Sequence, residues 1–382
     1  MVAPLVLVVL DLSGAWSRGA LTGFTRVAHE RGWGLLHYHP GIDLKWLAAR
    51  FRPVATVLGP SVGPWPDALR SAVCVSLNVD RTAQGIPSVC VDDAAVGALS
   101  FQHFWSRGYR TVSTFRFDDS EFAVVRERAF LAAAEQRGAA LASGWWQDGA
   151  NPPRSIEDPD AISDWLLSLP RPTAIFAGCD PWGRVVARYA RVLGLRVPED
   201  IALLGVDNDT AECELLSPAL SSVAVPWSSL GETAAELVLR GLSGSRLSPK
   251  RVDVAPVGVV SRPSSDRAAV SDPTVSAAMN WIEEHATRRV RVPMVAEAVG
   301  VPRRRLERRF RVALGRSVLE EIRRAHVEVA KRLLETTGLT LPEIARRSGF
   351  TNAGLLAEAF RRETELTPGQ YRRKVSSARL AS

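Results

Sequence analysis

The residues most able to do chemistry in this 382-residue chain are arginines near its C-terminal end. Six of them fall within residues 303–311: Arg303, Arg304, Arg305, Arg308, Arg309 and Arg311. Leu306, Phe310 and Leu314 recur among them at helical spacing, so an apolar face can pack inward while the cationic face points outward. Such a helix suits the major groove of DNA. A solvated basic surface helix is the alternative, which we disfavour because so many like charges repel one another unless an anion is near.

The surrounding residues predict two helix-turn-helix units. Residues 295–314 contain a short helix, a turn at Gly300 and then the arginine-rich helix. Residues 340–362 repeat this outline, and Thr340 and Glu343 there form a capping box. A long amphipathic helix over residues 318–337 joins the two units. This arrangement would place two recognition helices in successive major grooves, roughly 34 Å apart.

Three stretches of this region resemble the DNA-binding domain of AraC-type transcription regulators. They are AVGVPRRRLERRF (298–310), LLETTGLTLPEIARRSGF (333–350) and AFRRETELTPGQYRR (359–373). Arg303, Arg304 and Arg305 lie at the start of the first recognition helix, so we expect them to meet base edges, and we expect Arg308, Arg309 and Arg311 to meet phosphates. Thr351 and Asn352 are the candidate DNA contacts of the second unit. Gly354 and Glu358 depart from the family pattern in the second recognition helix. A glycine weakens a helix and a glutamate repels phosphate, so we expect the first unit to read bases.

Charge is distributed unevenly along the chain. Residues 274–382 hold 22 Lys and Arg against 12 Asp and Glu, whereas residues 1–273 hold 26 against 29. The net charge of +7 therefore belongs to the C-terminal part, where it favours a nucleic-acid partner over a membrane surface. Four cysteines without paired spacing favour a reduced, cytoplasmic protein. The opening apolar run is short and leads into Asp11, so we expect a first strand there and not a signal peptide.

Residues 5–262 alternate short β-rich runs with helical segments. The expected strands are 5–10, 34–38, 55–58, 72–77, 111–115, 173–177 and 202–206, with a further run at 88–91. The expected helices are 18–30, 94–107, 122–137, 160–169, 181–193 and 228–242. This alternation predicts parallel sheets wrapped by helices, and its length predicts two lobes. We therefore expect a two-lobed α/β ligand-binding domain at 1–262, a linker at 263–273 and an all-α domain with two helix-turn-helix units at 274–376.

Polar residues that follow expected strands suit a sugar, because ligands of such sheets lie at the carboxyl ends of strands. The candidates are Trp16, Asp92, Phe122, Arg126, Asp207 and Asn208. Carboxylates accept paired hydroxyl groups, arginine and asparagine donate, and aromatic rings cover the apolar face of a sugar. A plainer interpretation stays open, since an aspartate at a helix start is often a cap and Asp-Asn after a strand is often a turn.

Other stretches resemble LacI-type sugar sensors of the periplasmic-binding-like fold. They are Val91–Asp93 with Gly97, Arg126–Phe130, and Ile201–Asn208. The resemblance implies that Asp92, Arg126 and Asp207 contact a monosaccharide, a pentose such as xylose or a related sugar. It also implies a homodimer. A LacI-type sensor ahead of an AraC-type domain implies a sugar-responsive transcription regulator, and AraC-type regulators are mostly activators.

An enzyme is the competing class of function. Residues 59–63, GPSVG, match a nucleophile elbow, but the prolines that follow prevent the helix this motif requires. His37 and His39 would share one face of a strand, yet no third metal ligand lies nearby in sequence. We therefore predict no catalytic residue, no metal site and no cofactor. A non-sugar effector such as a purine is the alternative for the sensor.

Overall fold

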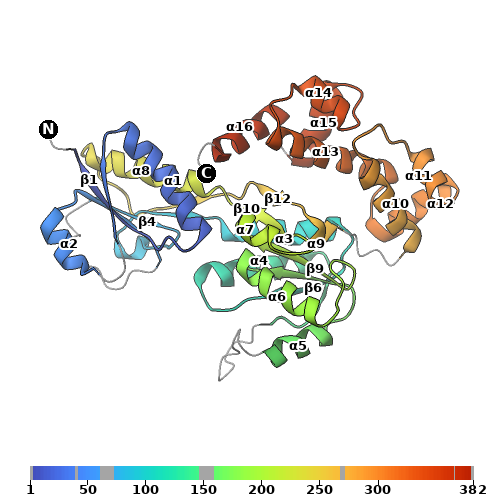
Figure 1. Cartoon of the computed structure of the whole chain (residues 1–382), viewed down its shortest axis with the longest axis horizontal. Coiled ribbons are helices and arrows are strands. Elements are labelled where there is room, and N and C mark those ends of the chain that lie inside the picture. Colours follow the sequence, from blue (N-terminus) through green and yellow to red (C-terminus); the bar gives the residue numbers. More distant parts are fainter. Residues whose placement is uncertain are drawn as a thin grey trace.

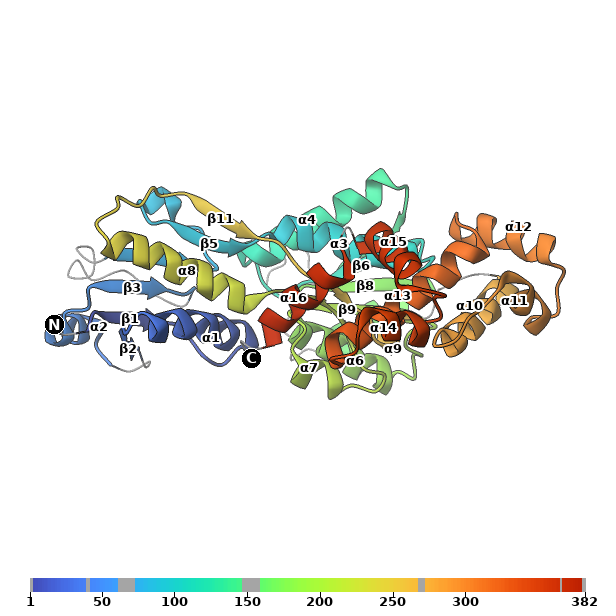
Figure 2. The same ribbon diagram turned by 90° about the horizontal axis from the view of Figure 1, so that it is seen from above.

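The computed structural model describes residues 3–38, 42–60, 73–145, 159–266, 272–364 and 366–379. Within these residues the chain forms two α/β lobes side by side and a helical domain that lies along them (Figure 1). The view from above shows the helical domain extending past the second lobe, with α11 and α12 at its far end (Figure 2). One apolar core includes residues of both lobes, a second core lies in lobe 2, and the helical domain has two cores of its own.

Lobe 1 is built on a six-stranded parallel sheet of order β11-β5-β4-β3-β1-β2. Its strands are β1 (Leu5–Val9), β2 (Gly34–His37), β3 (Ala55–Leu58), β4 (Val73–Leu77), β5 (Ser88–Val91) and β11 (Arg251–Val254). Its helices are α1 (Ala15–Glu30), α2 (Leu44–Phe51) and α8 (Trp227–Leu242), with a 3-10 turn at Thr82–Gln84. The central strand β3 is buried along its whole length, as expected for a parallel sheet covered on both faces.

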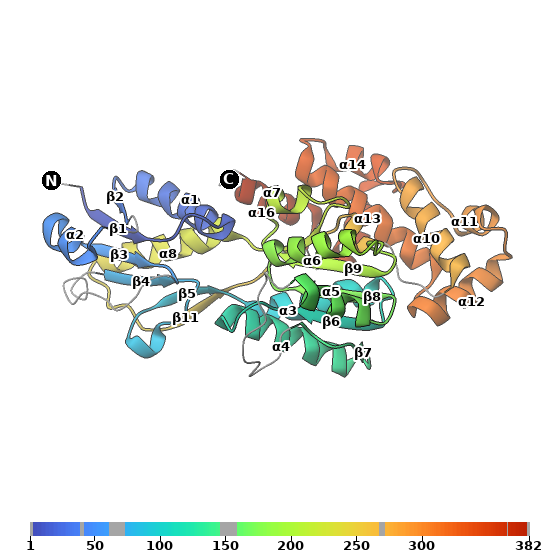
Figure 3. The same cartoon turned by 60° about the horizontal axis from the view of Figure 1, so that its bottom comes forward.

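Lobe 2 has a six-stranded sheet of order β12-β10-β9-β8-β6-β7, parallel except for β12. Its strands are β6 (Thr111–Phe115), β7 (Ala140–Leu141), β8 (Thr173–Ala177), β9 (Ile201–Val206), β10 (Ser221–Ala224) and β12 (Gly258–Val260). Its helices are α3 (Asp93–Ser106), α4 (Glu121–Gln136), α5 (Pro159–Ser168), α6 (Asp180–Val192), α7 (Thr210–Glu214) and α9 (Pro263–Asp266). The chain passes between the lobes after β5, after β10 and between β11 and β12, so three crossings join the two lobes (Figure 3).

The helical domain holds two small cores that share one long helix. Its helices are α10 (Pro273–His285), α11 (Val292–Ala298), α12 (Arg303–Leu314), α13 (Val318–Thr336), α14 (Leu341–Arg347), α15 (Ala353–Thr364) and α16 (Pro368–Arg379). From α13, Ile322 packs in the core with α12, while Leu334 packs in the core with α14 and α15. The expected capping box is present, because Glu343 accepts hydrogen bonds from the backbone N–H and the hydroxyl of Thr340. Helix α13 is thus a rigid spacer between the two units.

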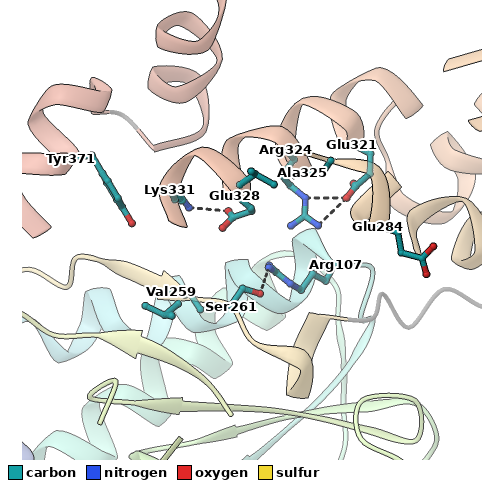
Figure 4. Close-up of a pocket in the computed structure, with 13 residues that line it drawn as sticks. Arg107, Val259, Ser261, Glu284, Glu321, Arg324, Ala325, Glu328, Lys331 and Tyr371 are labelled. Atoms are coloured by element: carbon teal, nitrogen blue, oxygen red, sulfur yellow. Dashed lines mark hydrogen bonds and ion pairs between the residues drawn. The ribbon is translucent and has the colours of Figure 1, made fainter. Parts of the chain in front are cut away.

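The helical domain contacts both lobes. Helix α16 lies against α8 of lobe 1. Helix α13 lies over the end of α3 and over β12 of lobe 2 (Figure 4). At the far end, Arg110 of lobe 2 donates to the carbonyl of Ala313 at 3.4 Å. A movement of one lobe relative to the other must therefore alter contacts of the helical domain.

The expected architecture is confirmed: a two-lobed α/β domain precedes an all-α domain with two helix-turn-helix units. Among the elements of the lobes, the expectation omitted the helices α2, α7 and α9 and four strands, β7, β10, β11 and β12. These strands hold two to four residues each, too few for a clear alternation of apolar and polar side chains. The first residues of the expected linker form α9, where Ser264 and Ser265 are buried against lobe 2.

Candidate ligand cavity and DNA interface

A cavity of about 540 Å³ lies in the cleft between the lobes, and we call it the cleft cavity. Its walls carry carboxylates from Asp11, Asp80, Asp93, Glu121, Asp207, Asp209 and Glu212. Two guanidinium groups, from Arg126 and Arg251, oppose them, and the rings of Trp16, Phe122 and Trp227 complete the lining. The cavity is therefore acidic with aromatic walls, a lining suited to an uncharged, hydroxyl-rich ligand.

Arg126 lies at the centre of the polar wall. Its side chain is buried, and its Nε donates to Asp93 Oδ1 at 2.7 Å. Its Nη1 donates to the carbonyl of Gly178 at 2.8 Å and lies 3.9 Å from Asp207 Oδ1. The guanidinium also sits 4.8 Å from the centre of the Phe122 ring, within cation–π range. One arginine thus holds two carboxylates and an aromatic ring in a fixed arrangement.

Both carboxylates beside Arg126 are held in a low-dielectric environment. Burial raises the pKa of Asp93, and Arg126 opposes only part of that rise. Burial raises the pKa of Asp207 well above its usual range; Arg126 opposes this, while the carboxylates of Asp180 and Asp93 add to it. Buried carboxylates paired with one arginine bind a ligand's hydroxyl groups strongly, because water competes little there.

The loop after β9 is strained into the shape that directs Asp207 to the cavity. Asp207 has φ of 107° and Asn208 has φ of 53°, values that non-glycine residues rarely adopt. Three hydrogen bonds hold the loop: Asp207 N to the Val223 carbonyl, Asn208 N to Ser222 Oγ, and Asp209 N to Asp180 Oδ2. Burial raises the pKa of Asp180 to about 7, so this supporting carboxyl titrates near neutrality.

Four of the six residues expected at the ligand line the cleft cavity: Trp16, Phe122, Arg126 and Asp207. Asp92 does not; its carboxylate accepts from Ala95 N at 2.9 Å and caps α3. The next residue, Asp93, faces Arg126 instead, because one step along a helix start turns a side chain by roughly 100°. Asn208 also points elsewhere, and its Oδ1 accepts from Arg262 Nη2 at 2.8 Å. The plainer interpretation, an Asp cap, thus describes Asp92.

Arg251 was not among the expected residues and joins the two lobes. Its Nη1 lies 3.4 Å from Glu121 Oε1, at the start of α4 in lobe 2. The same atom lies 3.8 Å from Asp80 Oδ2 in lobe 1. No signal in the sequence marks Arg251, because its strand β11 is a short edge strand far along the chain from both partners.

Helix α12 carries the expected cationic face. Leu306 and Phe310 are fully buried, while Arg303, Arg304 and Arg305 are exposed, as is Arg308. Arg309 differs, because its Nη1 lies 2.8 Å from each carboxylate oxygen of Asp272, just before α10. The arginine is therefore engaged within the protein, which argues against its expected role as a phosphate contact.

The second unit presents fewer groups to DNA. Thr351 and Asn352 are both exposed at the start of α15. The Asn352 side chain accepts from Leu355 N at 2.9 Å, so it caps α15. Leu355 and Glu358 are exposed further along this helix. The first turns of α15 thus expose an apolar and an acidic residue where α12 exposes arginines, and the exposed arginines of α15, Arg361 and Arg362, lie only in its last turn.

A groove of about 440 Å³ lies between the two units, and we call it the basic groove. Its cationic residues are Arg289, Arg291, Arg303, Arg323 and Arg362, against Glu358 and Glu363. Arg291 and Arg323 are exposed and come from different elements, the turn before α11 and helix α13. The sequence could not show this groove, because only the packing of α11 beside α13 brings these arginines together.

The other candidate motifs acquire no chemistry in the part of the chain that the structure describes. His37 Nε2 lies 2.9 Å from the Leu10 carbonyl, and His39 falls outside the described residues. Of the GPSVG motif only Gly59 and Pro60 are described. Among the described residues no cluster of histidine, cysteine and acidic side chains could hold a metal ion. None of the described helices combines the length and apolar character needed to cross a membrane.

Comparison with known proteins agrees with both halves of the chain. Residues 101–265 match the periplasmic binding protein-like domain, and residues 295–374 match a helix-turn-helix domain. The xylose operon regulatory protein of Escherichia coli K12 is 31% identical over 295 residues, which cover 74% of this chain and 73% of that protein. The protein of the same name in Haemophilus influenzae is 26% identical over 294 residues, 75% of this chain and 74% of its own. The chain belongs to the family of xylose operon regulatory proteins.

The fold of the whole chain has a solved counterpart. The structure titled xylose-binding transcription activator covers 97% of this chain and 97% of its own, with a TM-score of 0.59 and 24% identity. The expected pairing of a LacI-type sensor with an AraC-type DNA-binding domain is confirmed. The protein is a DNA-binding transcription regulator.

Proposed function

We propose that the regulator senses a monosaccharide, a pentose or a related sugar, bound in the cleft cavity. The observation that carries this proposal is Arg126 held between Asp93 and Asp207, with the rings of Trp16 and Phe122 on the same cavity. Carboxylates accept paired hydroxyl groups of a sugar, and aromatic rings cover its apolar face. The names of its relatives, which refer to xylose, support the same class of ligand.

The charge of the cleft cavity narrows the class of sugar. Acidic side chains outnumber the two arginines in its lining, and both arginines already face carboxylates. An anionic ligand such as a sugar phosphate or a uronate would enter a negative potential without a free cation to receive it. We therefore expect neutral sugars to bind and their phosphorylated forms to be rejected.

Calorimetric titration with pentoses, hexoses, sugar phosphates and purine bases tests this proposal. We expect one neutral sugar to bind, and the Asp93→Asn substitution to weaken that binding at least tenfold. Asp92→Asn is the matched control: this neighbour caps α3, asparagine also caps well, and the side chain does not line the cavity. A purine that binds in place of every sugar, or equal losses in the two variants, would overturn the proposal.

On the DNA side, we propose that Arg303, Arg304 and Arg305 read base edges from α12. Arginine forms two hydrogen bonds with guanine O6 and N7, and these side chains are exposed at the start of the helix. Arg308 would bind phosphate. Arg291 and Arg323 of the basic groove would also bind phosphate, which is the role first expected of Arg309. Thr351 and Asn352 would add weaker contacts from the second unit.

The Arg304→Ala substitution tests base reading. We expect specific affinity to fall by about 1–3 kcal/mol, whereas affinity for random duplex stays nearly unchanged. An equal loss on both duplexes would show that Arg304 is a phosphate contact. The specific duplex is the one that the wild-type protein selects from a random library.

We further infer that the regulator is an activator and has no enzymatic activity. We also infer that it acts as a homodimer in the cytoplasm, where its DNA lies. Two protomers would make binding to a repeated operator bivalent. Light scattering coupled to size exclusion measures the mass, and a monomer of 41.5 kDa at working concentration would contradict this. A reporter gene under the selected duplex tests activation, since an activator raises its transcription when the sugar is added.

A further inference from the structure

A continuous row of buried and partly buried polar groups in lobe 2 begins beside the cleft cavity. Asn208 lies between Asp207 and Asp209, both of which line that cavity. The Asn208 side chain faces away from the cavity, and its Oδ1 accepts from Arg262 Nη2 at 2.8 Å. Arg262 is the residue immediately before α9, the last described element before the helical domain. Any movement of the Asp207–Asp209 loop therefore alters the hydrogen bond that Arg262 donates to Asn208.

The row continues from Arg262 into the interior of lobe 2. Ser221 Oγ accepts from the backbone N–H of Arg262 at 2.8 Å and donates to its carbonyl at 2.7 Å. Ser265 Oγ donates to Ser221 Oγ at 2.7 Å. His103 follows, with Nε2 2.7 Å from Ser265 Oγ and Nδ1 2.9 Å from Arg107 Nη1. These groups come from β10, from α9 and the residue before it, and from α3, and together they connect the cavity loop to the end of α3.

Each hydrogen bond in this row has only one direction. A guanidinium can only donate, so His103 Nδ1 accepts from Arg107 and Nε2 carries the proton donated to Ser265. Burial lowers the pKa of His103 well below its usual value, and the charges of Arg107, Arg324 and Lys331 lower it further. The imidazole is therefore neutral, as this arrangement requires. Ordered rows of this kind are cooperative, because losing one buried bond leaves its neighbours unsatisfied.

The far end of the row is the surface on which the helical domain lies. Arg107 Nη2 donates to Ser261 Oγ at 2.7 Å, and both residues line a cavity of about 270 Å³ beneath α13 (Figure 4). The opposite wall of this interdomain cavity carries the charged residues Glu321, Arg324, Glu328 and Lys331 of α13. Burial alone would raise the pKa of Glu328, but Lys331 and Arg107 hold it below its usual value. The charge of Arg107 thus acts directly on α13.

We propose that the row from Asn208 through Arg262, Ser221, Ser265 and His103 to Arg107 couples the cleft cavity to the position of α13. Because α13 packs against both units, its position sets how the two recognition helices meet DNA. The residues of the row act as positioning residues, since none of them lines the cleft cavity and none lies on a recognition helix. This inference rests on the proposed function of the cleft cavity as the effector site. Coupling is reciprocal, so DNA must change effector affinity by the same factor as the effector changes DNA affinity.

The Ser265→Ala substitution breaks the row at its centre by removing one hydroxyl group. Ser264→Ala is the matched control, because Ser264 lies on the same helix and is equally buried. Its hydroxyl donates to the Leu203 carbonyl and accepts from the backbone N–H of Ser221, both at 2.8 Å. It therefore makes as many hydrogen bonds as Ser265 but contacts the row only through the Ser221 backbone. Both variants should be destabilised to a similar degree. A purely structural role would therefore give both variants the same behaviour.

The measurement is the ratio of DNA dissociation constants with and without saturating D-xylose, or another sugar from the calorimetric panel if D-xylose does not bind. The full-length protein is used with the duplex selected by the wild type. Allosteric ratios are commonly of the order of 5- to 150-fold. We expect the Ser264→Ala variant to keep the wild-type ratio. In the Ser265→Ala variant, sugar should still bind, but the two DNA dissociation constants should differ by less than about twofold. A wild-type ratio in Ser265→Ala, or an equal loss in Ser264→Ala, overturns the proposal.

A second experiment measures DNA binding without an effector, so its outcome does not depend on whether a sugar binds in the cleft cavity. Asn208→Gly removes the side chain that begins the row, and glycine tolerates the φ of 53° at this position. We expect Asn208→Gly to change DNA affinity at least threefold in the wild-type background. In the Ser265→Ala background it should change affinity by less than twofold, because the row is already broken. Equal effects in the two backgrounds, or no effect in the wild type, would show that the row carries no coupling.

Discussion

Asp180 provides a quantitative test of how the cavity loop is held. Its carboxylate is fully buried, accepts from Ser222 Oγ at 2.6 Å and from Asp209 N at 2.8 Å, and has a pKa raised to about 7 by burial. Its pKa in the unfolded chain is about 3.8. The unfolded state therefore loses its proton at lower pH than the folded state, so Asp180 makes the protein less stable as the pH rises from about 4 to about 7.

The size of this effect follows from the two pKa values. Between pH 5 and pH 7, the shift predicts a loss of about 2 kcal/mol in the free energy of unfolding from Asp180 alone. Asp180→Asn keeps the shape of the side chain and cannot ionise, so this part of the pH dependence should disappear. The variant should also lower the pKa of Asp207, because the Asp180 carboxylate is one of the groups that raise it. The difference in slope should decline above pH 7 and vanish above about pH 8, where the folded state has also lost the proton.

Urea unfolding followed by tryptophan fluorescence, at pH 5, 6, 7 and 8, measures the effect. At pH 5, where the wild-type carboxyl is protonated, the two proteins should have similar stability. From pH 5 to pH 7 the wild type should lose about 2 kcal/mol more than the variant. Equal slopes, or a variant that loses stability faster than the wild type, would refute the assignment of a protonated carboxyl at this position.

Three further predictions concern the helical domain. Arg323→Ala should lower DNA affinity equally on specific and random duplexes and reduce the salt slope by about one, measured by titration at several salt concentrations. Gly349→Ala should destabilise the domain by about 1–3 kcal/mol in thermal unfolding, because φ is 77° and an added Cβ would lie 2.5 Å from a histidine ring atom of α13. Gly338→Ala, with open space around it, should be close to neutral. Asp272→Ala should lower stability by about 1 kcal/mol, because it removes the α10 cap and the ion pair with Arg309, and calorimetry showing no change would contradict a stabilising role for Asp272.

The contacts of the helical domain with both lobes bear on how the regulator responds to its effector. Helix α16 meets lobe 1, whereas α13 and the Ala313 carbonyl meet lobe 2. Arg251 already spans the cleft to Glu121 in the described conformation. A movement of one lobe relative to the other therefore changes contacts of the helical domain within the same chain.

Local patterns determined much of this protein. The spacing of Leu306, Phe310 and Leu314 sets the buried face of α12, and the arginines between them must then point outward. The capping box at Thr340 and the glycine turns mark the units of the helical domain. These features are readable because helix periodicity, capping and turn conformation depend on residues only a few positions apart.

The tertiary structure alone decided which polar groups meet. Arg309 bonds Asp272 at a separation of 37 residues, Arg262 bonds Asn208 at 54, and His103 meets Ser265 at 162. Sequence separation carries no information about such pairs, since they depend on how whole elements pack. The sequence also could not show which of two neighbouring aspartates faces the cleft cavity. At the start of α3, Asp93 contacts Arg126, whereas Asp92 caps the helix. The local sequence thus sets the buried and exposed faces of the helices, whereas the cleft cavity and the hydrogen bonds between distant residues depend on the packing of whole elements.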